Sequence, residues 1–289
     1  MKPGERTGGP SPDENDTRDL GDLVANLTEV YQPIFGHPEF SDRAVRECET
    51  RLADITKTYK ALASKLDRPL RVLDLGCAQG YFSFGLAKLG ATVSGFDFVD
   101  RNIAVCNALA AEHPAFQVRF QTGRIEEAIA RIQSEQYDLV LGLSVFHHLV
   151  HQLGVGPVQQ LFHRLADTTL AGVFELALNC EPLFWAAAQP QNPKDLMEAY
   201  AFVRELARHP SHLSPVQRPL YVASNFYWFV EDRAEAFHSW KSVSDEVVTI
   251  HVKGRHFFGD DHIVKLFSLD RPTDFIRRDE MRPPGSRKK

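Results

Sequence analysis

The stretch that decides the fold is LDLGCAQGYFSFGLAKLGATVSGFDF, residues 73–98. It begins as an apolar strand, breaks at Gly76 and Gly80, continues with helical spacing, and ends on Asp97 after a second apolar strand. In an open parallel sheet, small molecules bind beyond the carboxyl ends of the strands, and the first strand-to-helix turn makes the closest contacts. The stretch therefore predicts a ligand site at this turn.

The ligand is expected to carry a ribose. The turn lacks the G-x-G-x-x-G spacing of dinucleotide-binding proteins, so it predicts no cradle for a pyrophosphate. Asp97 lies 21 residues beyond Gly76, where a carboxylate accepts hydrogen bonds from both hydroxyls of a ribose. A purely structural role for Asp97 is the weaker interpretation, because an isolated acid at the end of an apolar strand needs a hydrogen-bond or charge partner.

Strands and helices alternate through the centre of the chain. The predicted strands span 70–75, 91–96, 117–121, 137–142 and 170–176, and the predicted helices span about 80–89, 101–112, 124–133 and 156–168. Strands separated by helices of this length indicate an α/β fold, a parallel sheet with helices on its faces. Apolar residues at helical spacing between Asp19 and Leu66 predict further helices before the first strand.

Composition differs at the two ends of the chain. Residues 1–18 are rich in Gly, Pro and charge and predict a disordered tail, and residues 276–289 predict a frayed polar tail. After Glu181, prolines and scattered aromatic residues predict an irregular insertion on the substrate side or a second module.

The overall composition is that of an ordinary globular protein, with 43% hydrophobic residues, 25% charged residues and a formal net charge of −5. It predicts no general affinity for nucleic acid or for anionic membranes. The cysteines form no C-x-x-C pair, and the chain has no signal peptide and no long apolar run, so the expected location is the cytoplasm. The four cysteines, expected to be reduced thiols, are Cys48, Cys77, Cys106 and Cys180.

A wider set of motifs carries a resemblance to a known family. L-D-L-G-C-A-Q-G followed by G-F-D-F resembles the class I S-adenosylmethionine-dependent methyltransferases. Over about residues 20–270, the chain resembles the methyltransferase half of the bifunctional kinase-methyltransferases that cap O-antigen polymannose chains. The motifs that carry this closer resemblance are VYQPIFGHPEF, RPLRVLDLGCAQGYFS, GRIEEAIA, GLSVFHHLVHQLG, ELALNCEPLFWAAAQP and HLSPVQRPLYVASN.

The resemblance implies a Rossmann-like methyltransferase sheet and an enzyme that methylates the non-reducing end of a surface polysaccharide, at a terminal phosphate or a sugar hydroxyl, and so stops its extension. The implied cofactor is S-adenosylmethionine. The implied partners are a polysaccharide or glycolipid acceptor and a glycosyltransferase or separate kinase, with no nucleic acid and with membrane association only through partners. Two alternatives stay open, a small-molecule or RNA-phosphate methyltransferase and a catalytically silent scaffold that docks to glycosyltransferases.

Carried over motif by motif, the resemblance implies a cofactor pocket. Its residues would be Tyr31, Gln32, Arg51, Asp74, Gly76, Gly80, Asp97, Phe98, Gly123, Arg124, Ile125, Glu126 and Leu143. In this pocket Arg51 would grip the cofactor carboxylate with two parallel hydrogen bonds, and Phe98 would flank the adenine. The alternatives without a role in binding are that Arg51 is a solvated charge on a helix and that Tyr31 is an aromatic residue of the core.

The acceptor side is expected after the fourth strand. A sugar hydroxyl needs a base to take its proton, whereas a phosphomonoester is already anionic and needs cationic holders. One of His147 and His148, the candidate catalytic residues, is expected to contact the acceptor, while His151 packs or caps. The spacing of His147 and His151 offers no third ligand, so no metal site is expected. Glu175, Glu181 and Arg218 are further candidates, for which surface roles are equally open.

The C-terminal stretch RHFFGDDHIVKLFSLD resembles the first strands of a kinase small lobe, with Lys265 in the place of the lysine that meets nucleotide phosphates. No H-R-D-type loop and no D-F-G-type motif follows it, so this chain is not expected to be a complete kinase. A separate kinase, an acceptor without phosphate, and a truncated longer protein all stay open. The predicted division is 1–18 tail, 19–222 methyltransferase domain with a helical cap, 223–275 kinase-like segment and 276–289 tail.

Overall fold

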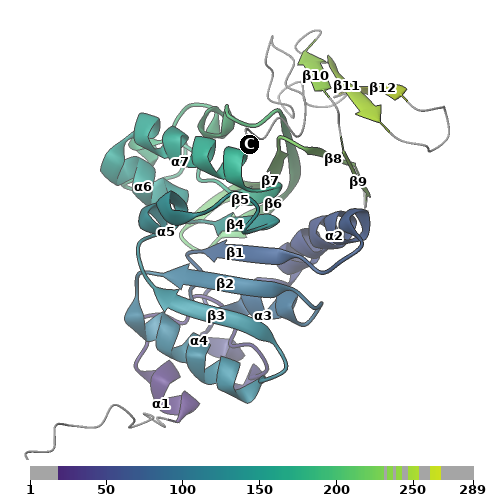
Figure 1. Ribbon diagram of the computed structural model, residues 1–289. Coiled ribbons are helices and arrows are strands. Elements are labelled where there is room, and N and C mark those ends of the chain that lie inside the picture. The colour runs from purple at the N-terminus through teal and green to yellow at the C-terminus, as the bar shows by residue number, and fades with distance from the viewer. Residues whose placement is uncertain (1–18, 231–232, 237–238, 243–246, 254–260, 268–289) are drawn as a thin grey trace, which may run out of the picture.

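The computed structural model describes residues 19–230, 233–236, 239–242, 247–253 and 261–267 (Figure 1). The predicted tails 1–18 and 276–289 lie outside these residues, as does the side chain of Lys265. Side chains are described up to residue 229, except residue 41, and again over 233–236.

A seven-stranded sheet forms the centre of the described structure, with the strand order β3-β2-β1-β4-β5-β7-β6 (Figure 1). The first five strands run parallel, and they confirm the predicted alternation. Their bounds are β1 (Arg71–Leu75), β2 (Thr92–Asp97), β3 (Gln117–Thr122), β4 (Leu139–Leu143) and β5 (Ala171–Glu175). This order places the carboxyl ends of β1, β2 and β4 side by side, which is where a ligand binds in such a sheet.

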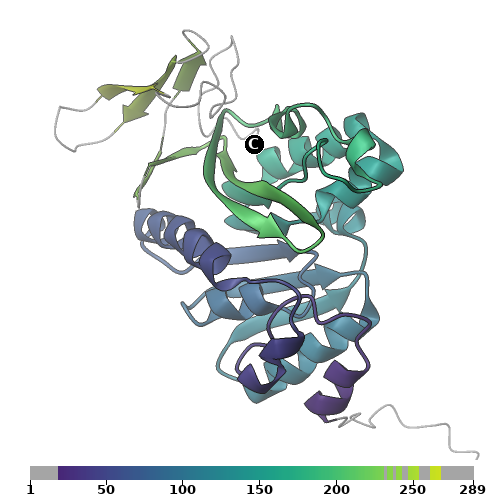
Figure 2. The same cartoon turned by 180° about the vertical axis from the view of Figure 1, so that it is seen from behind.

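Helices cover both faces of the sheet, as predicted (Figures 1 and 2). One face carries α2 (Glu49–Leu66), α3 (Tyr81–Ala87) and α4 (Asp100–Glu112), with α1 (Leu20–Ala25) packed against α4. The other carries α5 (Ile125–Arg131), α6 (Phe146–Leu153) and α7 (Val155–Thr168). Along β1, Val72 packs in the core cluster of α2 and α3, and Leu73 in that of α5 to α7. A strand covered on both faces becomes a continuous apolar run, as in LVLGL of β4.

The proline-rich stretch after Glu181 is only partly irregular. Its first part contains two short 3-10 helices, Ala186–Ala188 and Pro193–Met197, but it then forms an antiparallel hairpin of β6 (Phe202–Ser211) and β7 (Ser214–Ser224). The hairpin completes the main sheet beside β5, so the sheet is mixed rather than wholly parallel, and the predicted boundary after residue 222 falls within β7.

Two features of the hairpin explain why its prolines do not break it. Pro210 lies on β6, the edge strand, next to an irregularity in the register, where a missing N–H is tolerated. On β7, Pro215 and Pro219 lie before the stretch 220–223 that pairs with β5. A second missed element is α6, which is separated from α7 by Gly154 at φ +86°.

The remaining described strands form two small antiparallel sheets. One pairs β8 (Tyr227–Val230) with β9 (Arg233–Ala236). The other has the order β10-β11-β12, with β10 (Ser239–Ser242), β11 (Val247–Lys253) and β12 (Asp261–Phe267). Lys265 lies on β12 opposite Thr249.

A buried carboxylate at the amino end of β4 joins two strands of the sheet. Asp138 is 1% exposed and accepts hydrogen bonds from Arg68 Nη1 at 2.7 Å, Arg71 Nη2 at 2.8 Å and the Arg71 backbone N–H at 2.8 Å. Burial opposes ionisation, but the hydrogen bonds from Arg68 and Arg71 hold the pKa of Asp138 well below its usual value of 3.8. Its charged form therefore stabilises the fold.

Replacing this carboxylate, Asp138→Asn, is expected to lower the free energy of unfolding at pH 7 by about 1–3 kcal/mol, because the Arg68 and Arg71 side chains and the Arg71 backbone N–H lose a charged acceptor. The lowered pKa gives stability that is present above about pH 4 and is lost as the pH falls towards the folded-state value. The difference in the free energy of unfolding between wild type and variant should therefore be smaller at about pH 3 than at pH 7. Urea unfolding at the two pH values measures it. Glu127→Gln, which loses an exposed ion pair with Arg131, is the control. A difference that is the same at both pH values would contradict this role.

Candidate functional site

The glycine turn between β1 and α3 adopts the strained backbone that its sequence predicts. Gly76 has φ +73° and Gly80 φ +80°, in the left-handed region that favours glycine. A Cβ on Gly76 would lie 2.9 Å from Val145 Cγ2, so the backbone is closely approached there. Ala78 shares the positive φ, at +48°. The turn thus presents backbone, rather than side chains, at the carboxyl end of β1.

Asp97, at the end of β2, is tied to this turn. It is 6% exposed, and its Oδ2 accepts a hydrogen bond from the Ala78 N–H at 2.9 Å. Its Oδ1 accepts from the Val99 N–H at 2.9 Å and from Asn102 Nδ2 at 3.2 Å. Burial raises the pKa of Asp97, while these three donors oppose the rise. A carboxylate offers about four acceptor positions, so Asp97 keeps capacity for one further donor.

Gln32, from the N-terminal segment, supports the same turn. Its side-chain oxygen accepts from the Tyr81 N–H at 3.0 Å, and its own N–H donates to Gln79 Oε1 at 3.0 Å. Gln79 in turn donates to Asn102 Oδ1 at 2.7 Å. The N-terminal segment is therefore fixed onto the glycine turn, with Gln32 holding the turn in shape.

Asp74 and Leu143 lie beneath the turn rather than in an open pocket. Asp74, on β1, is 2% exposed and accepts from Ser83 Oγ at 2.6 Å. Burial raises its pKa to about 6, with Ser83 opposing the rise. Leu143 ends β4 and is buried. Both positions support the site from within.

The segment after β3 lies beside the end of β2, and its adenine contact stays a prediction. Gly123 donates its N–H to the Asp97 carbonyl at 2.9 Å. Ile125 is buried in the core, and Arg124 Nε pairs with Glu126 Oε1 at 2.5 Å. Gly123 and Arg124 also line a groove of about 740 Å³, whose other walls come largely from β3 and α5. Phe98, just beyond Asp97, is 76% exposed and offers a free aromatic face.

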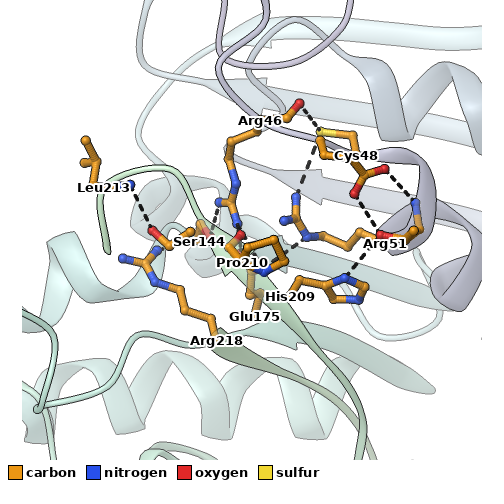
Figure 3. A network of polar contacts seen from close by, with 12 residues as sticks. Arg46, Cys48, Arg51, Ser144, Glu175, His209, Pro210, Leu213 and Arg218 are labelled. Carbon is orange, nitrogen blue, oxygen red and sulfur yellow. Dashed lines mark hydrogen bonds and ion pairs between the residues drawn. The ribbon is translucent and has the colours of Figure 1, made fainter. Parts of the chain in front are cut away.

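A buried cluster of charged side chains lies at the carboxyl ends of β4 and β5 (Figure 3). Glu175, which ends β5 and is fully buried, accepts from Arg46 Nη2 at 3.1 and 3.2 Å and lies 3.1 Å from Arg51 Nε. Glu181 accepts from Arg218 Nε at 2.8 Å and Nη2 at 2.7 Å. All five side chains are at most 4% exposed. Surface roles for Glu175, Glu181 and Arg218, and a solvated Arg51, are therefore wrong.

Ser144 joins the two sets of ion pairs. Its Oγ accepts from Arg46 Nη1 at 2.7 Å and from Arg218 Nη1 at 3.2 Å, and it donates to Glu175. Ser144 follows β4 directly and has φ +55°, an unfavourable conformation for a residue with a Cβ. Strain of this kind is held by surrounding structure and is typical of functional sites.

The cluster carries an excess of positive charge. Three arginines face two glutamates, and although burial opposes its ionisation, Arg51 and Arg46 lower the pKa of Glu175. Around it, buried polar atoms lack a hydrogen-bond partner among the described residues. They are Arg46 Nε, His147 Nδ1, Trp185 Nε1 and His212 Nδ1. A buried excess cation with unsatisfied neighbours favours the binding of an anion or of hydroxyl groups.

The predicted residues Tyr31 and Arg51 belong to this cluster. The Tyr31 hydroxyl accepts from Arg46 Nη1 at 2.6 Å, and its ring meets the ring of His212 edge to face at 5.2 Å. Arg51 directs its Nε to Glu175, so its predicted grip on the cofactor carboxylate stays a prediction. The glycine turn and the cluster are therefore both in contact with the N-terminal segment that carries Tyr31 and Gln32.

The two candidate histidines differ in environment. His147 is 4% exposed and packs on Trp185 at 4.8 Å, and its pKa is lowered to about 2 by burial and then by His148, Arg218 and Arg46. It is therefore a neutral and very weak base. His148 keeps part of its side chain in solvent, and partial burial, followed by Arg218 and His151, lowers its pKa. His151 packs edge to face on Phe184 at 5.1 Å, in keeping with its predicted packing role.

Arg46 and Ser144 are the site residues that sequence reasoning missed. Arg46 lies in the stretch between Asp19 and Leu66, for which the sequence predicts only helices, and no spacing marks it. Ser144 follows a predicted strand without a motif of its own. Among the residues that the structure describes, no three histidine, cysteine, aspartate or glutamate side chains gather as metal ligands. Within the same residues, no helix has the length and apolar character needed to cross a membrane.

Comparison with known proteins points to methyl transfer. A model of a methyltransferase domain family matches residues 66–161. Over 266 residues the chain is 47% identical to the O-antigen chain terminator bifunctional methyltransferase/kinase WbdD of Escherichia coli, covering 91% of this chain and 38% of the relative. A crystal structure of WbdD matches with a TM-score of 0.81 and 46% identity, over 88% of this chain and 56% of that chain.

A more distant relative is a ubiquinone biosynthesis O-methyltransferase of Methylobacterium nodulans, 40% identical over 81 residues, which are 28% of this chain and 31% of the relative. The chain thus spans 38% of the length of the WbdD relative. The similarity to WbdD extends far beyond the segment shared with the O-methyltransferase.

Proposed function

We propose that this chain, which is 47% identical to an O-antigen chain terminator over 91% of its length, is a class I methyltransferase that uses S-adenosylmethionine, methylates the end of an O-antigen saccharide and so stops its extension. Support comes from the relatives that are named O-antigen chain terminators and that align with 91% of this chain. The proposal extends their printed role to this chain through the part that the two share.

The proposed cofactor site is the glycine turn with Asp97 and the segment after β3. S-adenosylmethionine supplies a methyl group on a positively charged sulfur, which is already activated for displacement. Asp97 keeps one acceptor position, which a ribose hydroxyl would fill, and the exposed face of Phe98 would flank the adenine. The protein then has to align the donor with the acceptor and exclude water.

The observation that carries the acceptor proposal is the buried cluster of three arginines and two glutamates. A terminal phosphomonoester carries about −1.5 to −2 charge at pH 7 and needs no base. Arg46 and Arg218 would hold it beside Ser144, where both already donate hydrogen bonds. A sugar hydroxyl is less favoured, because His147 is too weak a base to remove a proton.

The phosphate itself would have to be added before methyl transfer. A kinase activity, from a separate protein or from a further part of the same chain, is the class of reaction that supplies it. Glycosyltransferases that extend the saccharide are the proposed partners, and membrane contact would come only through them.

Two synthetic acceptors test the proposal. The wild type should methylate a mannoside 3-phosphate about 100-fold faster than the unphosphorylated mannoside, since two charge-assisted hydrogen bonds contribute about 3 kcal/mol. Transfer of a radiolabelled methyl group measures both rates. Turnover should rise through about pH 6, as the phosphate loses its second proton, and His148→Ala should keep that rise. Faster methylation of the free sugar, with the rise lost in His148→Ala, would mean that the acceptor is a hydroxyl.

A further inference from the structure

A row of aromatic rings leads from the arginine cluster to the surface. The Arg218 guanidinium lies over the Trp185 ring, 5.8 Å from its centre. The Trp185 ring meets Phe184 at 4.7 Å, and Phe184 meets His151 at 5.1 Å, both edge to face. Trp185 is 4% exposed, whereas Phe184 is 71% exposed. The row therefore begins buried beside the proposed phosphate holder and ends in solvent.

The loop that carries these rings is held firmly at both ends. At its start, Glu181 accepts two hydrogen bonds from Arg218 and one from the Leu178 N–H at 3.0 Å. At its end, Gln189 Nε2 donates to the carbonyls of Trp185 at 3.1 Å and His147 at 3.2 Å. Phe184 is thus held in solvent by a fixed loop. A large apolar ring kept exposed in this way is typical of a binding surface.

We propose that Phe184, with His148 and His151, forms a subsite for the sugar ring that precedes the acceptor's terminal unit. The inference rests on the proposed function, because it assumes a saccharide acceptor whose end lies at Arg218. A pyranose presents an apolar C–H face, which packs on an aromatic ring, and a rim of hydroxyls, which pair with ring nitrogens. Phe184 supplies the first, and the exposed His148 and the neighbouring His151 supply the second.

The position of the aromatic row and the chemistry of its rings favour a sugar over a protein as the ligand. The row is continuous with the buried cluster through Trp185, whose Nε1 lacks a hydrogen-bond partner among the described residues. The exposed Phe184 ring beside His151, with His148 packed on the adjacent Trp185, is also suited to a neutral, polar ligand with one apolar face. The subsite would therefore bind the part of the saccharide that precedes its reacting end. It would favour long acceptors over short ones.

Acceptors of two lengths test the subsite. Phe184→Ala is expected to raise the KM for a phosphorylated tetrasaccharide about tenfold more than the KM for a monosaccharide 3-phosphate, as expected from the loss of one aromatic contact of about 1.5 kcal/mol. Phe184→Trp should restore the tetrasaccharide KM. Leu89→Ala, which also truncates an exposed apolar side chain but lies beyond α3, is the matched control and should change neither KM.

Equal effects of Phe184→Ala on the two acceptors would overturn the subsite, as would a change in self-association without a change in KM. Failure of the proposed function has a different signature, in which the wild type methylates neither acceptor. In that case calorimetric binding of the unphosphorylated tetrasaccharide still decides the subsite. Wild type should bind it and Phe184→Ala should not, and equal heats from both would refute the inference.

Discussion

Replacing Asp97 by alanine is expected to weaken the binding of S-adenosylmethionine by more than 100-fold. The variant loses the acceptor for the ribose, and the glycine turn loses the bond from the Ala78 N–H that fixes it against β2. A hydrogen bond to a charged group contributes about 1.5–3 kcal/mol, so the two losses together exceed about 3 kcal/mol. Isothermal titration calorimetry with the cofactor measures the change directly.

Two matched variants separate binding from folding. Asp97→Asn keeps one acceptor oxygen and should lose only about tenfold in affinity. Asp100→Ala removes an exposed acid three positions further on, in the first turn of α4, and should bind like the wild type. An unchanged affinity in Asp97→Ala, in a variant that melts like the wild type, would rule out Asp97 as the ribose ligand.

Arg218→Met is expected to lose both stability and methyl transfer. It leaves Glu181 buried without its arginine, a loss that typically costs about 3–5 kcal/mol in the free energy of unfolding. It also removes one of the two proposed holders of the acceptor phosphate. Urea unfolding measures the first effect, and methyl transfer to the mannoside 3-phosphate measures the second.

The double variant Arg218→Met, Glu181→Leu distinguishes the two roles of this arginine. Replacing both charges by apolar groups should restore most of the stability, because no buried charge is left unpaired. Methyl transfer should stay low, since the phosphate still lacks its holder. Arg131→Ala, which removes an arginine that is 80% exposed, controls for loss of charge alone. Recovery of transfer together with stability would show that Arg218 serves the fold only.

The geometry of the proposed cofactor half of the site was predictable because its residues are close in the sequence. The glycine turn and Asp97 lie within one 26-residue stretch, residues 73–98, in which each strand and turn has its own local signal. In the folded chain the turn is bound to the end of β2 by hydrogen bonds from the Gly76 and Cys77 N–H groups to the Phe96 carbonyl and from the Ala78 N–H to the Asp97 carboxylate. Local pattern therefore determines both the fold of this unit and the position of its polar groups.

The acceptor half could not be predicted in the same way. Arg46 and Glu175 are 129 positions apart, and Ser144 and Arg218 are 74 positions apart, so their contacts arise only once the sheet has formed. The hairpin that delivers Arg218 was itself missed, because its prolines suggest irregular chain unless their place at an edge strand is known. Charged residues in turn-rich sequence are ordinarily solvated, and only tertiary packing reveals that these are buried.

The histidines show a similar limit. Sequence alone gives each imidazole a pKa near 6.5, which makes His147 and His148 equally suitable as a base. Burial against Trp185 and the neighbouring arginines separates them, because it holds the pKa of His147 near 2. The surroundings of a side chain, which the sequence does not state, determine whether it can take a proton.

Arg46 has a consequence for how the molecule opens. Its guanidinium reaches Tyr31 in the N-terminal segment, Glu175 on β5 and the carbonyl of Pro210 on β6, at 3.3 Å for the last. Releasing the N-terminal segment would therefore remove one counter-ion from the buried Glu175 carboxylate. It would also break the contacts that Arg46 makes with β5 and β6. Such an opening leaves Glu175 with one counter-ion fewer in a buried position, so the N-terminal segment around Tyr31 is held by the core more firmly than its irregular backbone suggests.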